Sequence, residues 1–358
     1  MSNTGRLHTI DAMRGIAALA VVLYHVHTPA FQASGGWLID SLHAVFNYGT
    51  LGVAMFFAIS GFVIAAAMQR TLGLGGFGKF MAKRSVRLDP TYWASMALDI
   101  ALTAVAIRLA MPHSDLPSVR QVLLNLLYLQ DLTGVGGIVA VYWTLCIEIQ
   151  FYLVFGLIMT MGGRFRRTLF IGVTLYAMLV YVDLAPSPPG LFLPHWTMFI
   201  IGAAAYYYGV VQTQRWPEFI AIAALIIITA AHGGEKGMYL LEACLAAIFF
   251  YIGARRNRLR SWLNNPALLY LGSRSYSLYL FHTIVGERAA KLAVTVIGHA
   301  AAMPSVAIGI FLFAVACSML ATEIVCRFIE LPTLEFARRI FAPSSSRQAF
   351  DLAATKNQ

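Results

Sequence analysis

Long apolar segments recur along the whole chain, and they constrain its fold more than any other feature. A bilayer core about 30 Å thick is crossed by about 20 apolar helical residues. Only 12% of the residues are charged and 59% are hydrophobic, which excludes an ordinary soluble domain. The sequence predicts an all-α polytopic membrane protein with about ten transmembrane helices, near 12–28, 49–68, 91–111, 142–162, 168–183, 194–211, 217–233, 238–253, 275–298 and 303–327.

The basic residues between these segments predict the orientation of the chain. Lys and Arg collect in the cytoplasmic loops of membrane proteins. With the N-terminus in the cytoplasm, the inward loops hold most of them, including Arg164, Arg166 and Arg167. Both termini are therefore predicted to be cytoplasmic. Topology explains the net charge of +10, so nucleic acid is not an expected partner.

The apolar segments leave no room for a large soluble domain. We predict a single transmembrane domain over residues 1–341, followed by a disordered cytoplasmic tail over 342–358, where the sequence turns polar. The four cysteines lie in apolar stretches without the spacing of metal ligands. No metal site is expected.

The first apolar segment carries ionisable groups that a bilayer normally excludes. Asp11, Arg14 and His25 lie within IDAMRGIAALAVVLYHV, and such groups usually face a partner or a functional cavity. Eleven steps of 100° place Arg14 and His25 on one helix face, about 16 Å apart along the axis. Asp11 precedes Arg14 by one turn. Membrane anchoring by Arg14 and a packing role for His25 are the alternatives, but the shared face favours function.

Polar groups also interrupt or flank three later segments. Glu148 lies about two turns into an apolar helix, where a carboxylate needs a cation, a proton or a hydrogen-bond network. Arg84 and Arg87 are three residues apart, so they share a helix face and suit the oxygens of a phosphate group. Taken alone, the pair is better explained by ordinary anchoring at the membrane surface. Ser60 lies in the second segment, where helix packing is the favoured explanation.

The ninth segment brings hydroxyls and an imidazole into the membrane. Its opening, GSRSYSLYLFHTIV, contains Ser275, Tyr276, Tyr279 and His282. Tyr279 and His282 are three residues apart and share a helix face. A seam of hydrogen bonds between helices is the alternative to a functional site.

Together these motifs resemble the membrane-bound acyltransferase-3 family. The family signature of an arginine, ten residues and a histidine is matched by Arg14 and His25. Leu88 departs from the isoleucine usual after the paired arginines. The resemblance extends from residue 10 to about residue 332. Further matches, in family order, are F-F-x-x-S-G-F with Ser60, R-x-x-R-x-x-P-x-Y-W with Arg84 and Arg87, W-T-L-x-x-E-x-x-F-Y with Glu148 and Tyr152, and G-x-x-S-Y-x-x-Y-L-x-H with Tyr276 and His282.

The resemblance implies a membrane O-acyltransferase of the bacterial inner (cytoplasmic) membrane. It would move an acyl group, expected to be acetyl, from cytoplasmic acyl-coenzyme A to a hydroxyl of an extracytoplasmic glycan or glycolipid, such as an exopolysaccharide or lipopolysaccharide. Arg14, Arg84 and Arg87 would bind the donor phosphates. His25 and Glu148 would be catalytic, with Glu148 orienting His25 in a shared cavity. Supporting or acceptor-binding roles would fall to Asp11, Ser60, Tyr152, Tyr276 and His282.

Several points stay open on the sequence alone. Acetyl-coenzyme A is expected as a co-substrate, and no permanently bound cofactor is expected. The partners implied are the donor, the acceptor and the lipid bilayer. His25 could act as a general base or could itself be acylated. The main alternative function is a transporter or acyl-group shuttle that uses His25, Glu148 and His282 as a polar relay.

Overall fold

The structure, a computed structural model, describes residues 7–32, 34–69, 73–109, 115–231 and 233–341, so the predicted tail over 342–358 lies outside the described residues. The described residues form helices joined by loops and contain no strand, which confirms the all-α prediction. The helices are α1 (His8–Phe31), α2 (Trp37–Asn47), α3 (Gly52–Met68), α4 (Gly73–Arg108), α5 (Val119–Leu126), α6 (Tyr142–Thr160), α7 (Gly163–Tyr181), α8 (Trp196–Tyr206), α9 (Trp216–Ala231), α10 (Gly234–Arg255), α11 (Pro266–Phe281), α12 (Arg288–Ile297), α13 (Pro304–Val325) and α14 (Leu331–Phe341).

Seven runs of helix among the described residues are long and apolar enough to cross a membrane: His8–Phe31, Trp37–Met68, Gly73–Arg108, Tyr142–Thr160, Thr213–Ala231, Gly234–Arg255 and Pro304–Phe341. The three other predicted segments fall on α7, on α8 and on the run from α11 to α12. These findings establish a multi-pass membrane protein. The count of ten and the sides of the two termini stay predictions.

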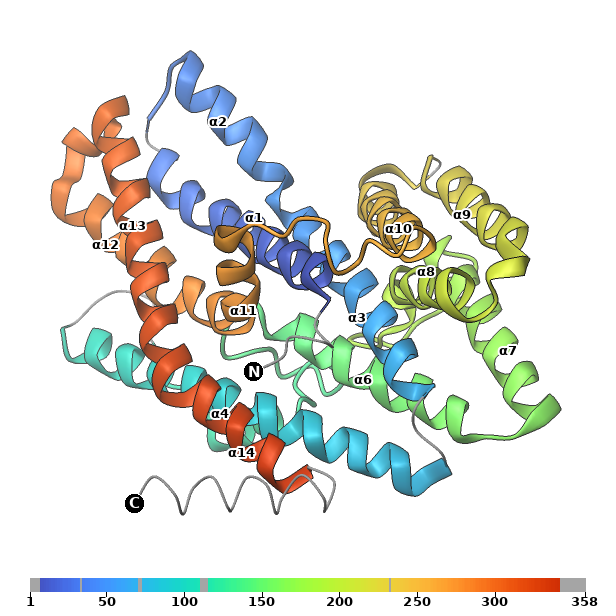
Figure 1. Cartoon of the computed structure of the whole chain (residues 1–358). Coiled ribbons are helices and arrows are strands. Elements are labelled where there is room, and N and C mark those ends of the chain that lie inside the picture. The colour runs from blue at the N-terminus through green and yellow to red at the C-terminus, as the bar shows by residue number, and fades with distance from the viewer. Residues whose placement is uncertain (1–6, 33, 70–72, 110–114, 232, 342–358) are drawn as a thin grey trace, which may run out of the picture.

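Helix α1 lies at the centre of one group of helices, where it packs against α3, α11 and α13 (Figure 1). Its sequence explains this position, because small residues let helix backbones approach closely. Gly15, Ala17 and Ala18 are all buried. The face of α1 that carries the ionisable groups is therefore enclosed by other helices.

The contact between α1 and α11 depends on two glycines. A Cβ atom at Gly15 would lie 2.6 Å from the backbone nitrogen of Gly272, and one at Gly272 would meet the backbone carbonyl of Asp11. The sequence predicts a short interfacial helix over 261–275 with a break at Gly272, and the predicted break is wrong. Helix α11 runs unbroken through Gly272 to Phe281, because the glycine makes room for α1.

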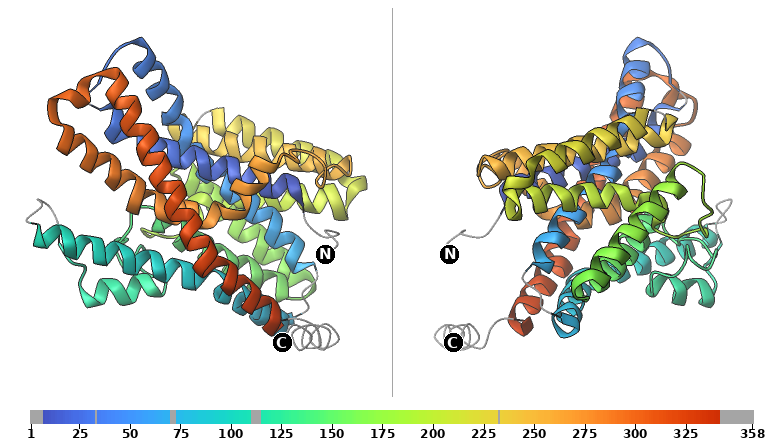
Figure 2. Two further views of the ribbon diagram at one scale, coloured as in Figure 1. Left: turned by 60° about the vertical axis from the view of Figure 1, so that its left-hand side comes forward. Right: turned by 90° about the vertical axis from the view of Figure 1, so that its right-hand side faces the viewer.

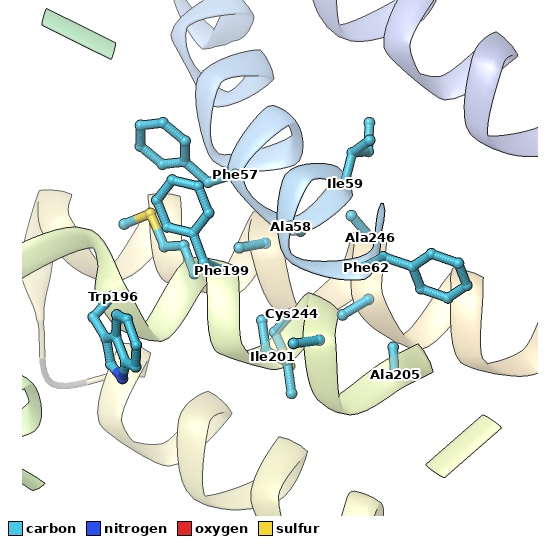
Figure 3. Packing of buried hydrophobic residues seen from close by; sticks show 14 of the residues in the cluster. Phe57, Ala58, Ile59, Phe62, Trp196, Phe199, Ile201, Ala205, Cys244 and Ala246 are labelled. Carbon is cyan, nitrogen blue, oxygen red and sulfur yellow. The ribbon is translucent and has the colours of Figure 1, made fainter. Parts of the chain in front are cut away.

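Helices α8, α9 and α10 lie side by side, on the side of α3 that faces away from the group around α1 (Figures 1 and 2). Aromatic and small side chains of α3, α8 and α10 form the core between them (Figure 3). Phe57 and Phe199 stack with their ring centroids 4.5 Å apart. A Cβ atom at Gly61 would meet the backbone carbonyl of Phe199, so α3 and α8 are in close backbone contact.

Helix α4 is longer than the predicted third segment. It has 36 residues and begins at Gly73, so Arg84 and Arg87 lie within it instead of preceding it. The segment KFMAKRSVRL consists mainly of good helix formers. The helix therefore continues past the apolar residues and fixes the geometry of the two arginines.

Candidate active site

Polar side chains from five helices line a cavity of about 90 Å³, which we call the arginine cavity. Arg14 comes from α1, Ser60 from α3, Arg84 and Arg87 from α4, Glu148 from α6 and Tyr276 from α11. The volume corresponds to about three water molecules. The structure thus brings together the three predicted donor-binding arginines with three other predicted site residues.

A hydrogen-bond network holds Glu148 in this cavity. The hydroxyls of Ser60 and Tyr152 both donate to Glu148 Oε1. Arg84 donates to the Tyr152 hydroxyl, and its Nη2 atom lies 3.5 Å from Glu148 Oε1. The guanidinium also lies over the Tyr152 ring, 4.4 Å from the centroid. Glu148 therefore has the cation and the hydrogen-bond donors that its place in an apolar helix requires.

The arginines retain capacity for an anion. The Nε atom of Arg84 is buried and has no hydrogen-bond partner among the described residues. Arg14 and Arg84 lie within electrostatic range of Arg87, as do the carboxylates of Asp11 and Glu330. Among the residues that line the cavity, three guanidiniums face one carboxylate, that of Glu148. Such a site favours phosphate oxygens, which accept charge-assisted hydrogen bonds from arginine.

His25 faces a different and larger space, which we call the histidine chamber. This chamber has a volume of about 900 Å³. Tyr24, Trp143, His195 and Tyr239 line it together with His25. It falls within the size range of ligand-binding pockets.

The carboxylate beside His25 is Glu287. His25 Nδ1 lies 3.7 Å from Glu287 Oε2, and both side chains are about three-quarters buried. Glu287 Oε1 also lies 2.7 Å from Lys291 Nζ. The His282 ring lies 5.1 Å from the His25 ring. A π-helical turn, His282–Glu287, follows α11 and supplies both neighbours.

The π-helical turn explains how His282 and Glu287 come to face the same residue. Its hydrogen bonds join residues five apart, so each turn is wider and holds more than the 3.6 residues of an α-helical turn. In an α-helix, five steps of 100° would rotate Glu287 about 140° past His282, and the wider turn reduces this rotation. The sequence gives no signal for this turn, so reasoning from helix periodicity misses Glu287.

The structure does not bring His25 and Glu148 together, and the expectation of one shared cavity is wrong. Glu148 lines the arginine cavity, whereas His25 lines the histidine chamber. Glu148 is held by Arg84 and Tyr152. Glu287 takes the position beside the imidazole. A relay in which Glu148 joins His25 and His282 lacks the required contact.

The two spaces nevertheless adjoin. Val53, Phe57 and Tyr279 line both of them. The Tyr279 hydroxyl is hydrogen-bonded to Thr144 Oγ1 at 2.7 Å, and its ring lies 5.9 Å from the His282 ring. Arg14 and His25 share one face of α1, and that face passes from one space to the other.

The remaining predicted residues lie close to these spaces. Tyr276 lines the arginine cavity, and its hydroxyl donates to the backbone carbonyl of Leu88 at 3.1 Å. His282 is fully buried, its Nδ1 atom 3.1 Å from the Leu278 carbonyl oxygen. Asp11 lies in the first turn of α1, where its backbone carbonyl faces Gly272. It does not line either space as Arg14 and His25 do.

Comparison with known proteins decides the family. The sequence model of the acyltransferase-3 family, which is described as an acyltransferase domain, matches residues 7–323. The chain belongs to the acyltransferase-3 family. It is a membrane O-acyltransferase, and the resemblance drawn from its motifs is confirmed.

Characterised relatives cover most of the chain. Acyltransferase MdmB of Streptomyces mycarofaciens is 25% identical over 89% of this chain and 88% of its own length. O-acetyltransferase OatA of Staphylococcus aureus is 22% identical over 93% of this chain. The match spans only 58% of the length of OatA, so that relative has a further part with no counterpart in the match. No solved structure is similar to the chain.

Proposed function

We propose that this acyltransferase moves an acetyl group from acetyl-coenzyme A, bound at the arginine cavity, to a sugar hydroxyl in the histidine chamber. One observation carries the proposal. Arg14 and His25 lie on one face of α1 and line two adjoining spaces, one rich in guanidinium groups and the other holding an imidazole beside a carboxylate. The O-acetyltransferases among the relatives support acetyl as the group transferred.

The donor phosphates would bind to Arg14, Arg84 and Arg87. The free Nε atom of Arg84 would donate to a phosphate oxygen, which relieves an unsatisfied buried donor. Glu148 and Tyr152 would hold the Arg84 guanidinium in place. The volume of the arginine cavity suits a phosphate-sized group but not the whole donor. The pantetheine arm would therefore extend past Val53, Phe57 and Tyr279 toward His25.

His25 would act as the general base. Its Nδ1 atom faces Glu287, which leaves Nε2 for the acceptor hydroxyl. As the hydroxyl oxygen attacks the thioester carbonyl, Nε2 takes the hydroxyl proton. Collapse of the tetrahedral intermediate forms the new ester and breaks the carbon–sulfur bond, and the imidazolium returns the proton to the departing thiolate. Glu287 would stabilise the imidazolium, as a carboxylate does in catalytic triads.

The distribution of basic residues supports the orientation. The arginine cavity would face the cytoplasm, where coenzyme A thioesters are made, and the histidine chamber would open on the opposite side. The protein would then lie in the bacterial inner membrane and modify an extracytoplasmic glycan or glycolipid of the cell envelope. Labelling of single cysteines from each side of intact cells tests this orientation.

The direct test of the function uses purified protein in nanodiscs with labelled acetyl-coenzyme A. Wild type should release the coenzyme A thiol and transfer the label, and His25→Ala should do neither. Label that remains on the protein before an acceptor is added would instead indicate an acyl-histidine intermediate. A well-folded wild type that neither binds nor consumes acetyl-coenzyme A would refute the proposed donor.

A further inference from the structure

A second space adjoins the histidine chamber and has no part in the chemistry described above. It has a volume of about 500 Å³, and we call it the side chamber. Trp143, Ser187, Pro194 and His195 line both spaces. The other walls of the side chamber come largely from the connections 127–141 and 182–192. The two spaces therefore form one extended site with Trp143 and His195 between them.

Hydrogen bonds hold the 182–192 connection in place. Gln150 Nε2 donates to the carbonyl of Gly190 at 2.9 Å, and the backbone nitrogen of Phe192 donates to Gln150 Oε1 at 3.1 Å. The Tyr176 hydroxyl donates to the carbonyl of Pro186 at 2.8 Å. A wall fixed at three points is pre-organised for binding, which lowers the entropic cost of holding a ligand.

The 127–141 connection is fixed in the same way. The Asn125 side chain donates to the Gly136 carbonyl at 3.2 Å and accepts from the Ile138 backbone nitrogen at 3.0 Å. At Gly190, a Cβ atom would meet the backbone of Asp131. The two connections thus touch, and the side chamber is bounded by both.

Trp143 provides a flat aromatic surface in this extended site. Its side chain is 38% exposed, and its ring lies 5.6 Å from the His195 ring. It is the second residue of α6, so a regular helix fixes its backbone. Sugar rings present faces of C–H groups that pack on indole rings, whereas their hydroxyls point outward to polar partners.

Asp131 provides a polar partner in the side chamber. Its Oδ2 atom is buried and has no hydrogen-bond partner among the described residues. Burial raises the pKa of the Asp131 carboxyl, and a hydrogen bond with Cys146 opposes that rise. A lipid tail in this chamber would leave that oxygen unsatisfied, which is costly. A sugar hydroxyl would donate to it.

We propose that the side chamber binds a second sugar unit, so that the preferred acceptor is an oligosaccharide and not a single sugar. The unit that receives the acetyl group would lie in the histidine chamber. Its neighbour would pack on Trp143 and donate a hydroxyl hydrogen bond to Asp131. This inference rests on the proposed function, and it names the class of acceptor.

The test compares single sugars with disaccharides. Purified protein in nanodiscs is given labelled acetyl-coenzyme A and methyl glycosides of glucose, galactose, mannose, rhamnose and N-acetylglucosamine, each as the monosaccharide and as a disaccharide. We expect kcat/KM for the best disaccharide to exceed that for its monosaccharide by at least about tenfold. Trp143→Ala should lower kcat/KM for the disaccharide much more than for the monosaccharide, because Trp143 lines both chambers, and so should remove this preference.

Two further variants sharpen the comparison. Asp131→Asn keeps the shape of the side chain and should reduce the disaccharide preference only in part. Trp37→Ala removes a tryptophan that is 80% exposed and lines neither chamber, so it should have no effect on the preference.

Three results would overturn the proposal. The first is an equal kcat/KM for disaccharides and monosaccharides, and the second is an equal loss of kcat/KM for both acceptors in Trp143→Ala. The third is acetylation of simple alcohols such as glycerol without acetylation of any of the sugars. In each case acyl transfer itself would stand. Failure to consume acetyl-coenzyme A under any condition would instead contradict the proposed function and the acceptor proposal together.

Discussion

The arginine cavity and the histidine chamber differ in how they are built. The arginine cavity is small, its polar residues come from helices, and Ser60 and Arg84 join Glu148 in one network. The histidine chamber is about ten times larger, and loops supply part of its wall. The first is suited to a ligand of fixed chemistry, such as a phosphate, whereas the second can be reshaped by its loops. We therefore expect changes in these loops to alter the use of acceptors and to leave donor binding unchanged.

Replacement of His25 should have the largest effect. His25→Ala removes the proposed base, and general-base catalysis contributes about 10²- to 10⁴-fold. The transfer rate should fall by that factor in a steady-state assay with acetyl-coenzyme A. Phe46→Ala offers a control, because Phe46 packs near the same end of α1 without lining the chamber. A transfer rate within threefold of wild type would exclude a chemical role for His25.

Replacement of Arg84 should affect the donor and not the acceptor. A hydrogen bond to a charged group contributes about 1.5–3 kcal/mol, so Arg84→Ala should raise the KM for acetyl-coenzyme A by about 10- to 100-fold. Arg84→Lys keeps the charge but loses the planar geometry, so its KM for acetyl-coenzyme A should lie between the values of wild type and Arg84→Ala. An unchanged donor KM in the alanine variant would show that the donor phosphates do not bind in the arginine cavity.

Replacing Glu287 in the histidine chamber and Glu148 in the arginine cavity compares the roles of the two spaces most directly. Glu287→Gln removes the charge beside His25, which should lower kcat by at least about tenfold while the donor KM stays unchanged. The measurement is a full kinetic profile over both substrates. If the donor KM rose and kcat did not fall, Glu287 would belong to donor binding.

Glu148→Gln should show the opposite pattern with a smaller effect. The amide can still accept from Ser60 and Tyr152, but Arg84 loses its charge partner. We expect the donor KM to rise by about three- to tenfold, with kcat changed less than in Glu287→Gln. The same kinetic profile checks this, and a dominant loss of kcat would restore Glu148 as the partner of His25.

The smallest effect on chemistry should come from the helix contact that aligns the two spaces. Gly272→Ala places a Cβ atom against the backbone carbonyl of Asp11, and such overpacking costs about 1–3 kcal/mol. The thermal midpoint should fall by several degrees in a fluorescence melt. Gly309→Ala is the matched control, because no atom lies within 4 Å of its added Cβ. Equal midpoints for the two variants would show that α1 and α11 can separate.

The sequence predicts the all-α membrane fold because apolar length is a local signal. It also predicts that Arg14 and His25 share a face, since that depends only on helix periodicity. The paired arginines and Glu148 are recognised from motifs, and the structure brings them together. These successes all involve residues within single helices.

The partners across helices could not be predicted in the same way. Periodicity does not show that Glu148 lies beside Arg84 and not beside His25, because that depends on how α4, α6 and α1 pack. Glu287 is missed because a π-helical turn changes the register after His282. Asp131 is missed because it lies in a connection whose path is set by tertiary hydrogen bonds.

The central claim is that donor binding and acyl transfer occur in two adjoining but separate spaces. The most direct test measures the binding of acetyl-coenzyme A to purified His25→Ala by calorimetry, alongside Arg84→Ala. Our account predicts that His25→Ala binds the donor with the affinity of wild type yet transfers the acetyl group at least about a hundredfold more slowly, whereas Arg84→Ala binds weakly. Loss of donor binding in a folded His25→Ala protein, with normal binding by Arg84→Ala, would contradict it.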